Sequence, residues 1–264
     1  DIHTAFPTLA YTERPDRFSA GVVEGRVGLL IDGLPLGWLL PGTLSQFFKT
    51  PQDKSQGWMA ASALMVLRYL CMLITLFLPA VYIAAVTFHL EMLPTELALS
   101  IIAAKQDVPF TTVFEVLLML VAFEIIQEAG LRLPSSIGQT VSILGGLVVG
   151  SAAVEARIVS PAVLIVVAVA GIAGYTMPSQ DFAGALRIWR FGLAALASLA
   201  GMFGAAIGAL LLICHLASLE SFGVAYLTPF AANAGEQVEG RTVLRQPLPK
   251  AKLREAALKI RNRR

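Results

Sequence analysis

The sequence predicts a mainly α-helical, polytopic membrane protein. Hydrophobic residues make up 56% of the chain and charged residues 14%, whereas soluble globular proteins carry about 25% charged residues. Four runs contain no Asp, Glu, Lys or Arg, and each is about long enough to cross a bilayer core of ~30 Å. These runs are residues 69–88, 137–154, 158–180 and 191–214. We expect about four transmembrane helices, an intramembrane or interfacial helical hairpin, and the end of a truncated cytoplasmic αβ domain at the N-terminus.

Residues 1–57 have the composition of a soluble segment, and we interpret them as the C-terminal remnant of a cytoplasmic soluble domain. Thr12 is a candidate helix N-cap, with Pro15 in the first turn of the helix. Two apolar runs, RVGLLI and LGWLL, flank Asp32-Gly33. An Asp-Gly pair between apolar runs is typical of a β-hairpin or tight turn.

Residues 58–230 are the predicted transmembrane domain. Its first crossing covers residues 62–87, with a kink expected at Pro79. Residues 92–104 are apolar but too short to span, and Glu155-Ala156-Arg157 is a tight turn between the second and third crossings. Residues 191–217 are predicted to form the last crossing as one helix, in which Gly201, Gly204 and Gly208 have the spacing of a helix-packing face.

The segment 111–129 is long enough to cross but carries three carboxylates, Glu115, Glu124 and Glu128. If it crosses, there are five spans, and the basic C-terminal tail lies opposite the basic residues near position 58. If it forms a hairpin with residues 92–110, there are four spans and both basic regions are cytoplasmic, as the positive-inside rule favours. We prefer four spans and leave the alternative open. Glu115 is expected at the interface.

Residues 231–264 form a basic tail that holds most of the excess positive charge. Nine of the twenty Lys and Arg residues lie between Arg241 and Arg264. We expect this tail to be cytoplasmic and to touch anionic lipid. Nucleic-acid binding would rest on the tail alone, and membrane topology explains its charge better.

The sequence holds no motif that predicts catalysis. GxSxG, HExxH, CxxC, P-loop and GxGxxG patterns are all absent from the sequence. The two cysteines, Cys71 and Cys214, lie in apolar runs, where packing is a better interpretation than a metal site. We expect no enzymatic activity, cofactor or metal.

Four stretches resemble one known family. They are TERPD with EGRV and DGLP in residues 12–35, TFHLEMLPT in 87–95, the long segment from Phe123 to Pro161, and SFGVAYLTP in 221–229. They resemble the A subunit of bacterial spore germinant receptors and its stage V sporulation AF-type paralogues. The sequence does not distinguish the receptor subunit from the paralogue.

The resemblance implies a multi-pass protein of the spore inner membrane. It also implies a B-type nutrient-binding membrane subunit and a C-type lipoprotein as partners, and a further cytoplasmic domain before Asp1. Family A subunits are thought to form a homo-oligomeric ring that acts as a nutrient-gated ion channel.

Small and polar residues recur at helical spacing in residues 137–154, where they could line an ion pathway. They are Gln139, Ser142, Gly146 and Gly150. The competing interpretation is close helix packing, because Gly146 and Gly150 form a small-xxx-small pattern. Glu124 and Glu128 would attract cations at one mouth of a ring; alternatively, Arg132 or interfacial water satisfies them.

Two functional hypotheses follow. In the first, the protein is a channel-forming A-type subunit that releases cations when nutrient is sensed. In the second, it is a non-conducting structural or signal-relay subunit of the receptor complex. A secondary transporter is disfavoured because the spans show no inverted repeat.

Overall fold

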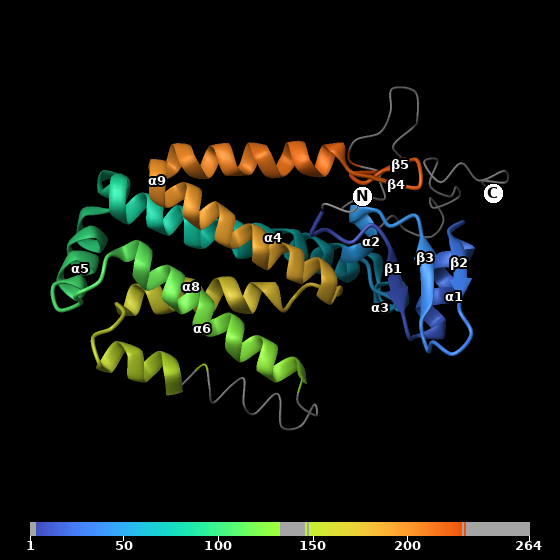
Figure 1. Ribbon diagram of the computed structural model, residues 1–264, viewed down its shortest axis with the longest axis horizontal. Coiled ribbons are helices and arrows are strands. Elements are labelled where there is room, and N and C mark those ends of the chain that lie inside the picture. Colours follow the sequence, from blue (N-terminus) through green and yellow to red (C-terminus); the bar gives the residue numbers. More distant parts are fainter. Residues whose placement is uncertain (1–3, 133–145, 147, 229, 231–264) are drawn as a thin grey trace. The chain divides into compact units, whose positions relative to one another are not determined.

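The computed structural model describes residues 4–132, 146, 148–228 and 230. These residues form two compact units. The first unit contains residues 4–72, 176–185 and the described part of 211–230, and the second contains the described part of 73–175 together with 186–210. The described chain is mainly helical, with a few short strands, as the sequence predicts (Figure 1).

The first unit is built on a three-stranded antiparallel sheet of order β1-β3-β2, covered by helix α1. Its strands are β1 (Ala10–Thr12), β2 (Val27–Leu30) and β3 (Gly37–Leu40), and α1 is Pro15–Val23. Strands β2 and β3 pair with Val27 opposite Leu40, which confirms the predicted hairpin. The Phe18 ring of α1 packs directly against Gly37 of β3. A Cβ at Gly37 would lie 2.6 Å from this ring, so the contact requires a residue without a side chain.

The first unit also contains two short helices and a second hairpin. Helix α1 begins at Pro15 with Arg14 as its N-cap, so the prediction of Thr12 as the cap is wrong. Helices α2 (Leu44–Phe48) and α3 (Pro51–Ser55) follow the sheet. Strands β4 (Glu220–Ser221) and β5 (Val224–Ala225) form a second hairpin, whose two turn residues, Phe222 and Gly223, have φ of 50° and 74°. Two successive positive φ values are typical of a type I′ turn.

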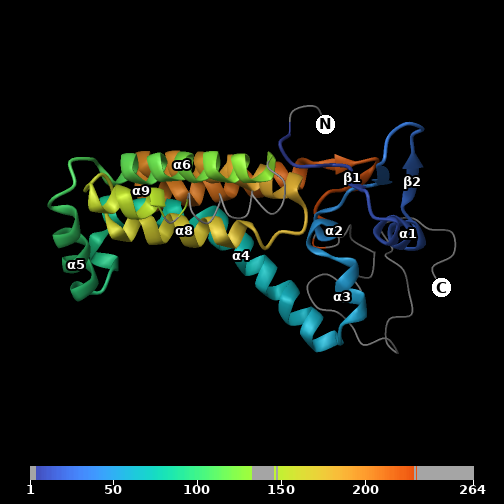
Figure 2. The ribbon, with the colours of Figure 1, turned by 90° about the horizontal axis from the view of Figure 1, so that it is seen from below.

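Helix α4 (Trp58–Phe88) contains the predicted first crossing and continues as one helix through Pro79. The 3-10 turn η1 (Leu90–Met92), helix α5 (Thr95–Lys105) and helix α6 (Thr112–Arg132) follow it. Figures 1 and 2 both show α6 beside α8 (Pro161–Gly174). Residues 148–155 are helical, and the turn after them contains Arg157 with φ 57°, so the predicted tight turn is confirmed.

Helix α9 (Gln180–Ser218) differs from the prediction of one continuous crossing. Its backbone leaves the helical region at Ala200 and at Gly201, which has φ 61° and ψ −139°. The chain then reverses direction (Figure 1). A Cβ at Gly208 would lie 2.6 Å from Leu193, although fifteen residues of straight helix would separate these positions by ~22 Å. The prediction fails because only glycine adopts such a conformation readily, and hydropathy does not record backbone torsion.

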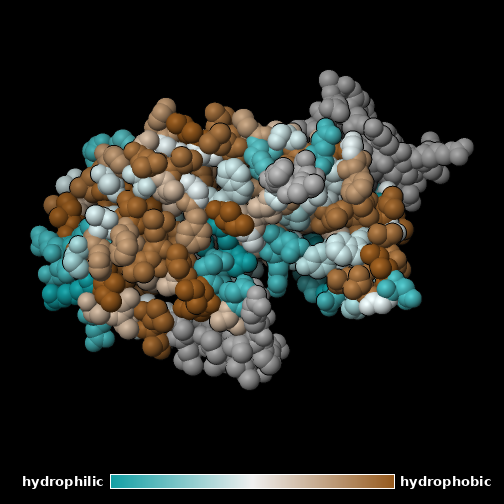
Figure 3. All heavy atoms as spheres, in the orientation of Figure 1, coloured by the Kyte–Doolittle hydropathy of each residue, from teal (hydrophilic) through white to brown (hydrophobic). Residues whose placement is uncertain are grey.

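Two of the described helices, α4 and α9, are long and apolar enough to cross a membrane by length and composition, but the length of α9 includes both segments on either side of the break at Gly201. Helix α8 has 14 residues and reaches only ~21 Å along its axis, less than the ~30 Å of a hydrocarbon core. The predicted number of four spans therefore stays a prediction. Hydrophobic side chains cover much of the visible surface of the helices, as a lipid-facing or subunit-facing surface requires (Figure 3).

Candidate functional site: charged groups among the apolar helices

A cluster of charged and polar side chains lies where α6 faces α9 in the second unit. Arg187 Nη1 lies 2.7 Å from Glu124 Oε1, and Arg190 Nη2 donates a hydrogen bond of 3.3 Å to Glu124 Oε2. Arg187 Nη1 also points at Gln127 Oε1, 3.5 Å away. Arg190 is only 1% exposed. We call these four residues the Glu124 cluster.

Helical spacing explains how the cluster assembles. Glu124 and Gln127 are three residues apart on α6, and Arg187 and Arg190 are three apart on α9. Residues at this spacing share one helix face, so two faces are enough to bring the four groups together. A buried guanidinium is costly unless a carboxylate compensates it. One carboxylate here serves two guanidinium groups, so the cluster carries excess positive charge and holds α6 against α9.

The partners of Glu124 differ from those predicted, which were Arg132 or interfacial water. They are two arginines about sixty residues further along the chain. One signal was present in the sequence. Apart from Asp181, the only charged residues between positions 158 and 219 are these two arginines, and isolated charges in apolar helices mark functional or structural pairs.

The other predicted site residues are distributed differently. Glu128 lies on α6 one turn beyond Glu124 and is exposed. Gly150 is buried, and a Cβ there would lie 2.9 Å from Leu164 Cδ1 of α8. A Cβ at Gly146 would meet no described atom within 4 Å. Gln139 and Ser142 lie outside the described residues. Gly150 is therefore at a packing contact, whereas no described residue contacts a Cβ placed at Gly146.

Glu115 is a buried carboxylate on α6, and its expected place at the membrane interface stays a prediction. It is 1% exposed, its Oε2 accepts a 2.8 Å hydrogen bond from the Ser160 N–H, and Lys105 Nζ lies 3.8 Å from its Oε1. Sequence reasoning missed this site because Ser160 and Lys105 come from α8's N-cap and the end of α5. Within the described ranges, no group of three His, Cys, Asp or Glu residues could hold a metal ion.

The first unit has its own buried ion pair. Arg68 donates from Nη1 and Nη2 to the Asp53 carboxylate at 2.7 and 3.0 Å, and Nη1 also donates to the Phe48 carbonyl at 2.8 Å. Burial of Asp53 opposes its ionisation, but the hydrogen bonds from Arg68 and from the Thr50 N–H outweigh burial and lower the pKa of this carboxyl. The pair joins the start of α4 to α3.

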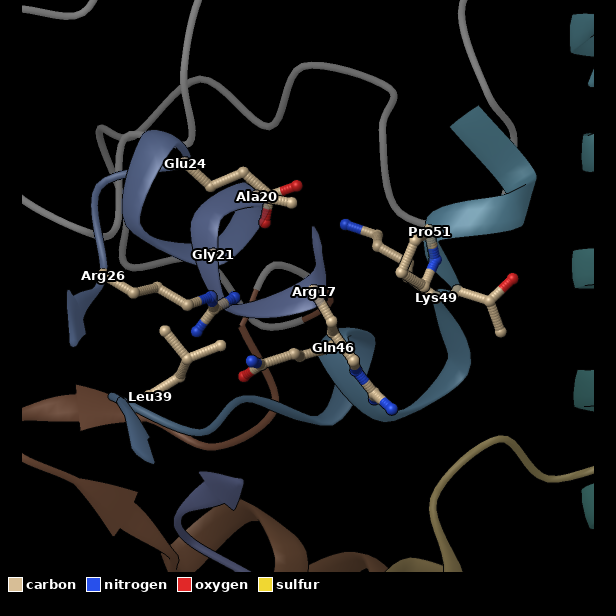
Figure 4. A pocket seen from close by; sticks show the side chains of 10 residues that line it. Arg17, Ala20, Gly21, Glu24, Arg26, Leu39, Gln46, Lys49 and Pro51 are labelled. Carbon is tan, nitrogen blue, oxygen red and sulfur yellow. The ribbon is translucent and has the colours of Figure 1, made fainter. Parts of the chain in front are cut away.

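A small cavity of about 50 Å³ lies between α1 and the α2–α3 segment (Figure 4). Its polar lining comprises Arg17, Glu24, Arg26, Gln46, Lys49 and Thr50. The Arg26 guanidinium is held by the Pro41 carbonyl and, at 3.2 Å, by Thr43 Oγ1. Burial, followed by the nearby charge of Arg14, lowers the pKa of Arg17. The cavity has room for about three or four water molecules.

Comparison with known proteins now places these features in a family. The family model described as "Bacillus/Clostridium GerA spore germination protein" matches residues 1–257. The chain belongs to this family. The match covers both units described above and confirms the resemblance seen in the sequence.

Curated relatives of this GerA-family chain come from Bacillus subtilis (strain 168). The chain is 44% identical to spore germination protein B1, over 92% of this chain and 50% of that protein. It is 43% identical to spore germination protein KA, over 90% of this chain and 44% of that protein. It is 41% identical to the uncharacterized membrane protein YfkQ, over 90% and 47%. The chain thus spans about half the length of the curated relatives it matches. No solved structure matches it.

Proposed function

We propose that this protein is an A-type membrane subunit of a spore germinant receptor, and that several copies surround a cation pathway lined by residues 137–154. Family membership supports the first part, because the relatives are named spore germination proteins. The two long apolar helices support a membrane location. The expected setting is the spore inner membrane, with a B-type nutrient-binding subunit and a C-type lipoprotein as partners and anionic lipid at the basic tail.

The difference between Gly146 and Gly150 carries the channel proposal. Gly150 is buried against Leu164, whereas a Cβ at Gly146 would meet open space among the described residues. This difference supports assigning packing to Gly150 and pore lining to Gly146. In a ring of subunits, the open position is the one that can face a shared axis.

The charged residues take separate roles in this proposal. Glu124 holds α6 to α9 through Arg187 and Arg190. Glu128, exposed one turn further along α6, is the carboxylate that would attract cations to the mouth. The pathway needs neither a cofactor nor a metal, and the subunit would act without catalysis.

Cation flux into liposomes containing the full-length protein and its partner subunits tests this proposal. We expect Gly146→Leu to reduce nutrient-dependent flux while size-exclusion chromatography shows an unchanged assembly. Gly150→Leu is the matched control, which should weaken the assembly or the fold because it collides with Leu164. Equal flux from Gly146→Leu and the wild type would contradict pore lining at this position.

A second candidate is a non-conducting relay subunit. It is supported by the Glu124 cluster, whose charges are used to hold α6 against α9. No flux from intact wild-type complexes after nutrient addition would favour the relay role over the channel.

A further inference from the structure

The side chain of Glu115 is the one fully buried carboxylate among the described residues of α6, with 0% of its side chain exposed. Moving a carboxylate out of water is costly unless cations and hydrogen bonds compensate its charge. Glu115 lies in the first turn of α6, where the helix dipole favours a negative charge by only ~0.3–1 kcal/mol. Its remaining compensation must come from specific neighbours.

The two carboxylate oxygens of Glu115 have unequal surroundings. Oε2 accepts a 2.8 Å hydrogen bond from the Ser160 N–H. Oε1 is buried and accepts no hydrogen bond from any described group. The cation nearest to it, Lys105 Nζ, is 3.8 Å away, which is beyond hydrogen-bonding distance. Glu115 Oε1 is therefore a buried anionic oxygen, and the nearest described cation, Lys105 Nζ, is too far away to hydrogen-bond to it.

Thr112 supplies a second oxygen close to the Lys105 ammonium. Lys105 Nζ donates to Thr112 Oγ1, one turn before Glu115 on α6. Glu115 Oε1 and Thr112 Oγ1 thus converge on one point, now occupied by an ammonium group. Tyr82 hydrogen-bonds to the side chain of Ser160, whose N–H binds the other carboxylate oxygen. Carboxylate and hydroxyl oxygens are ligands that hard cations prefer.

Lys105 is able to leave. It is the last residue of α5, and 30% of its side chain is exposed. A lysine ammonium is strongly hydrated and sits on a flexible four-carbon stem. Rotation of that stem would return the charge to water and leave Glu115 uncompensated. One carboxylate with neutral neighbours balances a single positive charge, so the ion that suits the vacated position is monovalent.

We propose that Glu115 and Thr112 form a monovalent-cation site in which the Lys105 ammonium is a tethered occupant, and that a free cation replaces it when Lys105 turns out to water. This site is separate from residues 137–154, and it does not depend on whether the protein forms a channel. It makes the junction of α5, α6 and α8 sensitive to the surrounding cation concentration.

Rubidium binding to the full-length protein in nanodiscs tests the site. Radioactive Rb⁺ is titrated at constant ionic strength, with N-methylglucamine as the inert replacement, and the melting temperature is measured in the same salts. Wild type should bind Rb⁺ weakly, because Lys105 competes. Lys105→Gln should bind one Rb⁺ per chain about tenfold tighter or better and should melt higher in rubidium. Adding Glu115→Gln should abolish both effects.

Arg157→Gln is the matched control. It also removes a cation near this end of the unit, but its partner Asp107 is exposed, with 62% of the side chain accessible. It should gain no Rb⁺ binding. The proposal is overturned if Lys105→Gln binds no Rb⁺, or if binding persists in the double variant. If Lys105→Gln folds only in rubidium and unfolds when rubidium is exchanged out, the site is supported; unfolding in both salts would contradict it.

Discussion

Two of the three acidic residues of helix α6, Glu115 and Glu124, are compensated in opposite ways. Glu124 is 31% exposed by side chain, yet two guanidinium groups hold it, one of them almost completely buried. Glu115 is completely buried, yet one partly exposed ammonium holds it at 3.8 Å. Glu124 is held by two arginines, whose planar guanidinium groups stay protonated. Glu115 is held by the flexible ammonium of Lys105, and this is the cation that we propose to exchange.

The largest effect is expected when the Glu124 carboxylate, which compensates two cations, is removed. Glu124→Leu leaves Arg187 and Arg190 without their carboxylate, and removal of one partner from a buried ion pair costs about 3–5 kcal/mol. We expect a loss of stability of this order in chemical unfolding followed by circular dichroism in detergent. Glu128→Leu, one turn away and exposed, should cost below ~1 kcal/mol. Similar losses in both variants would refute the assigned role of Glu124.

Replacing Glu115 should have a smaller effect. Glu115→Gln removes the negative charge but keeps an oxygen that can accept the Ser160 N–H, so we expect a loss of about 1 kcal/mol. Glu115→Leu also removes that acceptor, and leaving the buried N–H unsatisfied should cost a further ~1–3 kcal/mol. The same unfolding assay measures both variants. A Glu115→Gln variant as unstable as Glu124→Leu would show that the two positions are not compensated differently.

Asp53 in the first unit extends the comparison to pH. Its folded-state pKa is lowered, so its contribution to stability is fully present above the unfolded-state pKa of ~3.9 and is lost as the pH falls through the lower folded-state value. Wild type should therefore lose stability below about pH 4. Arg68→Met removes the donor responsible and should flatten that part of the profile. An unchanged acid limb in Arg68→Met would contradict the assignment.

The smallest effect is expected at an exposed pair. Arg14 Nη2 lies 2.7 Å from Asp16 Oδ2, but both side chains are about half exposed. Water and salt screen such pairs, and many contribute nothing measurable. Arg14→Gln should leave the unfolding midpoint unchanged at physiological ionic strength. A clear loss would mean that Arg14 has a partner beyond this pair, and a shift that disappears in high salt would identify that partner as charged.

Much of the helical content could be predicted from the sequence, because uncharged runs and turn residues are local signals. The run around Pro79 gave α4, Asp32-Gly33 gave the hairpin of β2 and β3, and Arg157 marked a turn. The break at Gly201 could not be predicted in this way. Glycine occurs often in membrane helices, so its presence at positions 201, 204 and 208 fits a packing face as well as a reversal.

The candidate site likewise has features that local sequence signals predict and others that they do not. The apolar helices, the resemblance to the spore germination proteins and the unusual charges of α6 can all be recognised in the sequence. The cations that compensate those charges are visible only in the folded chain: Arg187 and Arg190 for Glu124, and Lys105 for Glu115. Hydropathy and helical periodicity are local signals over a few residues, whereas a buried charge is compensated by whichever groups packing brings within ~4 Å.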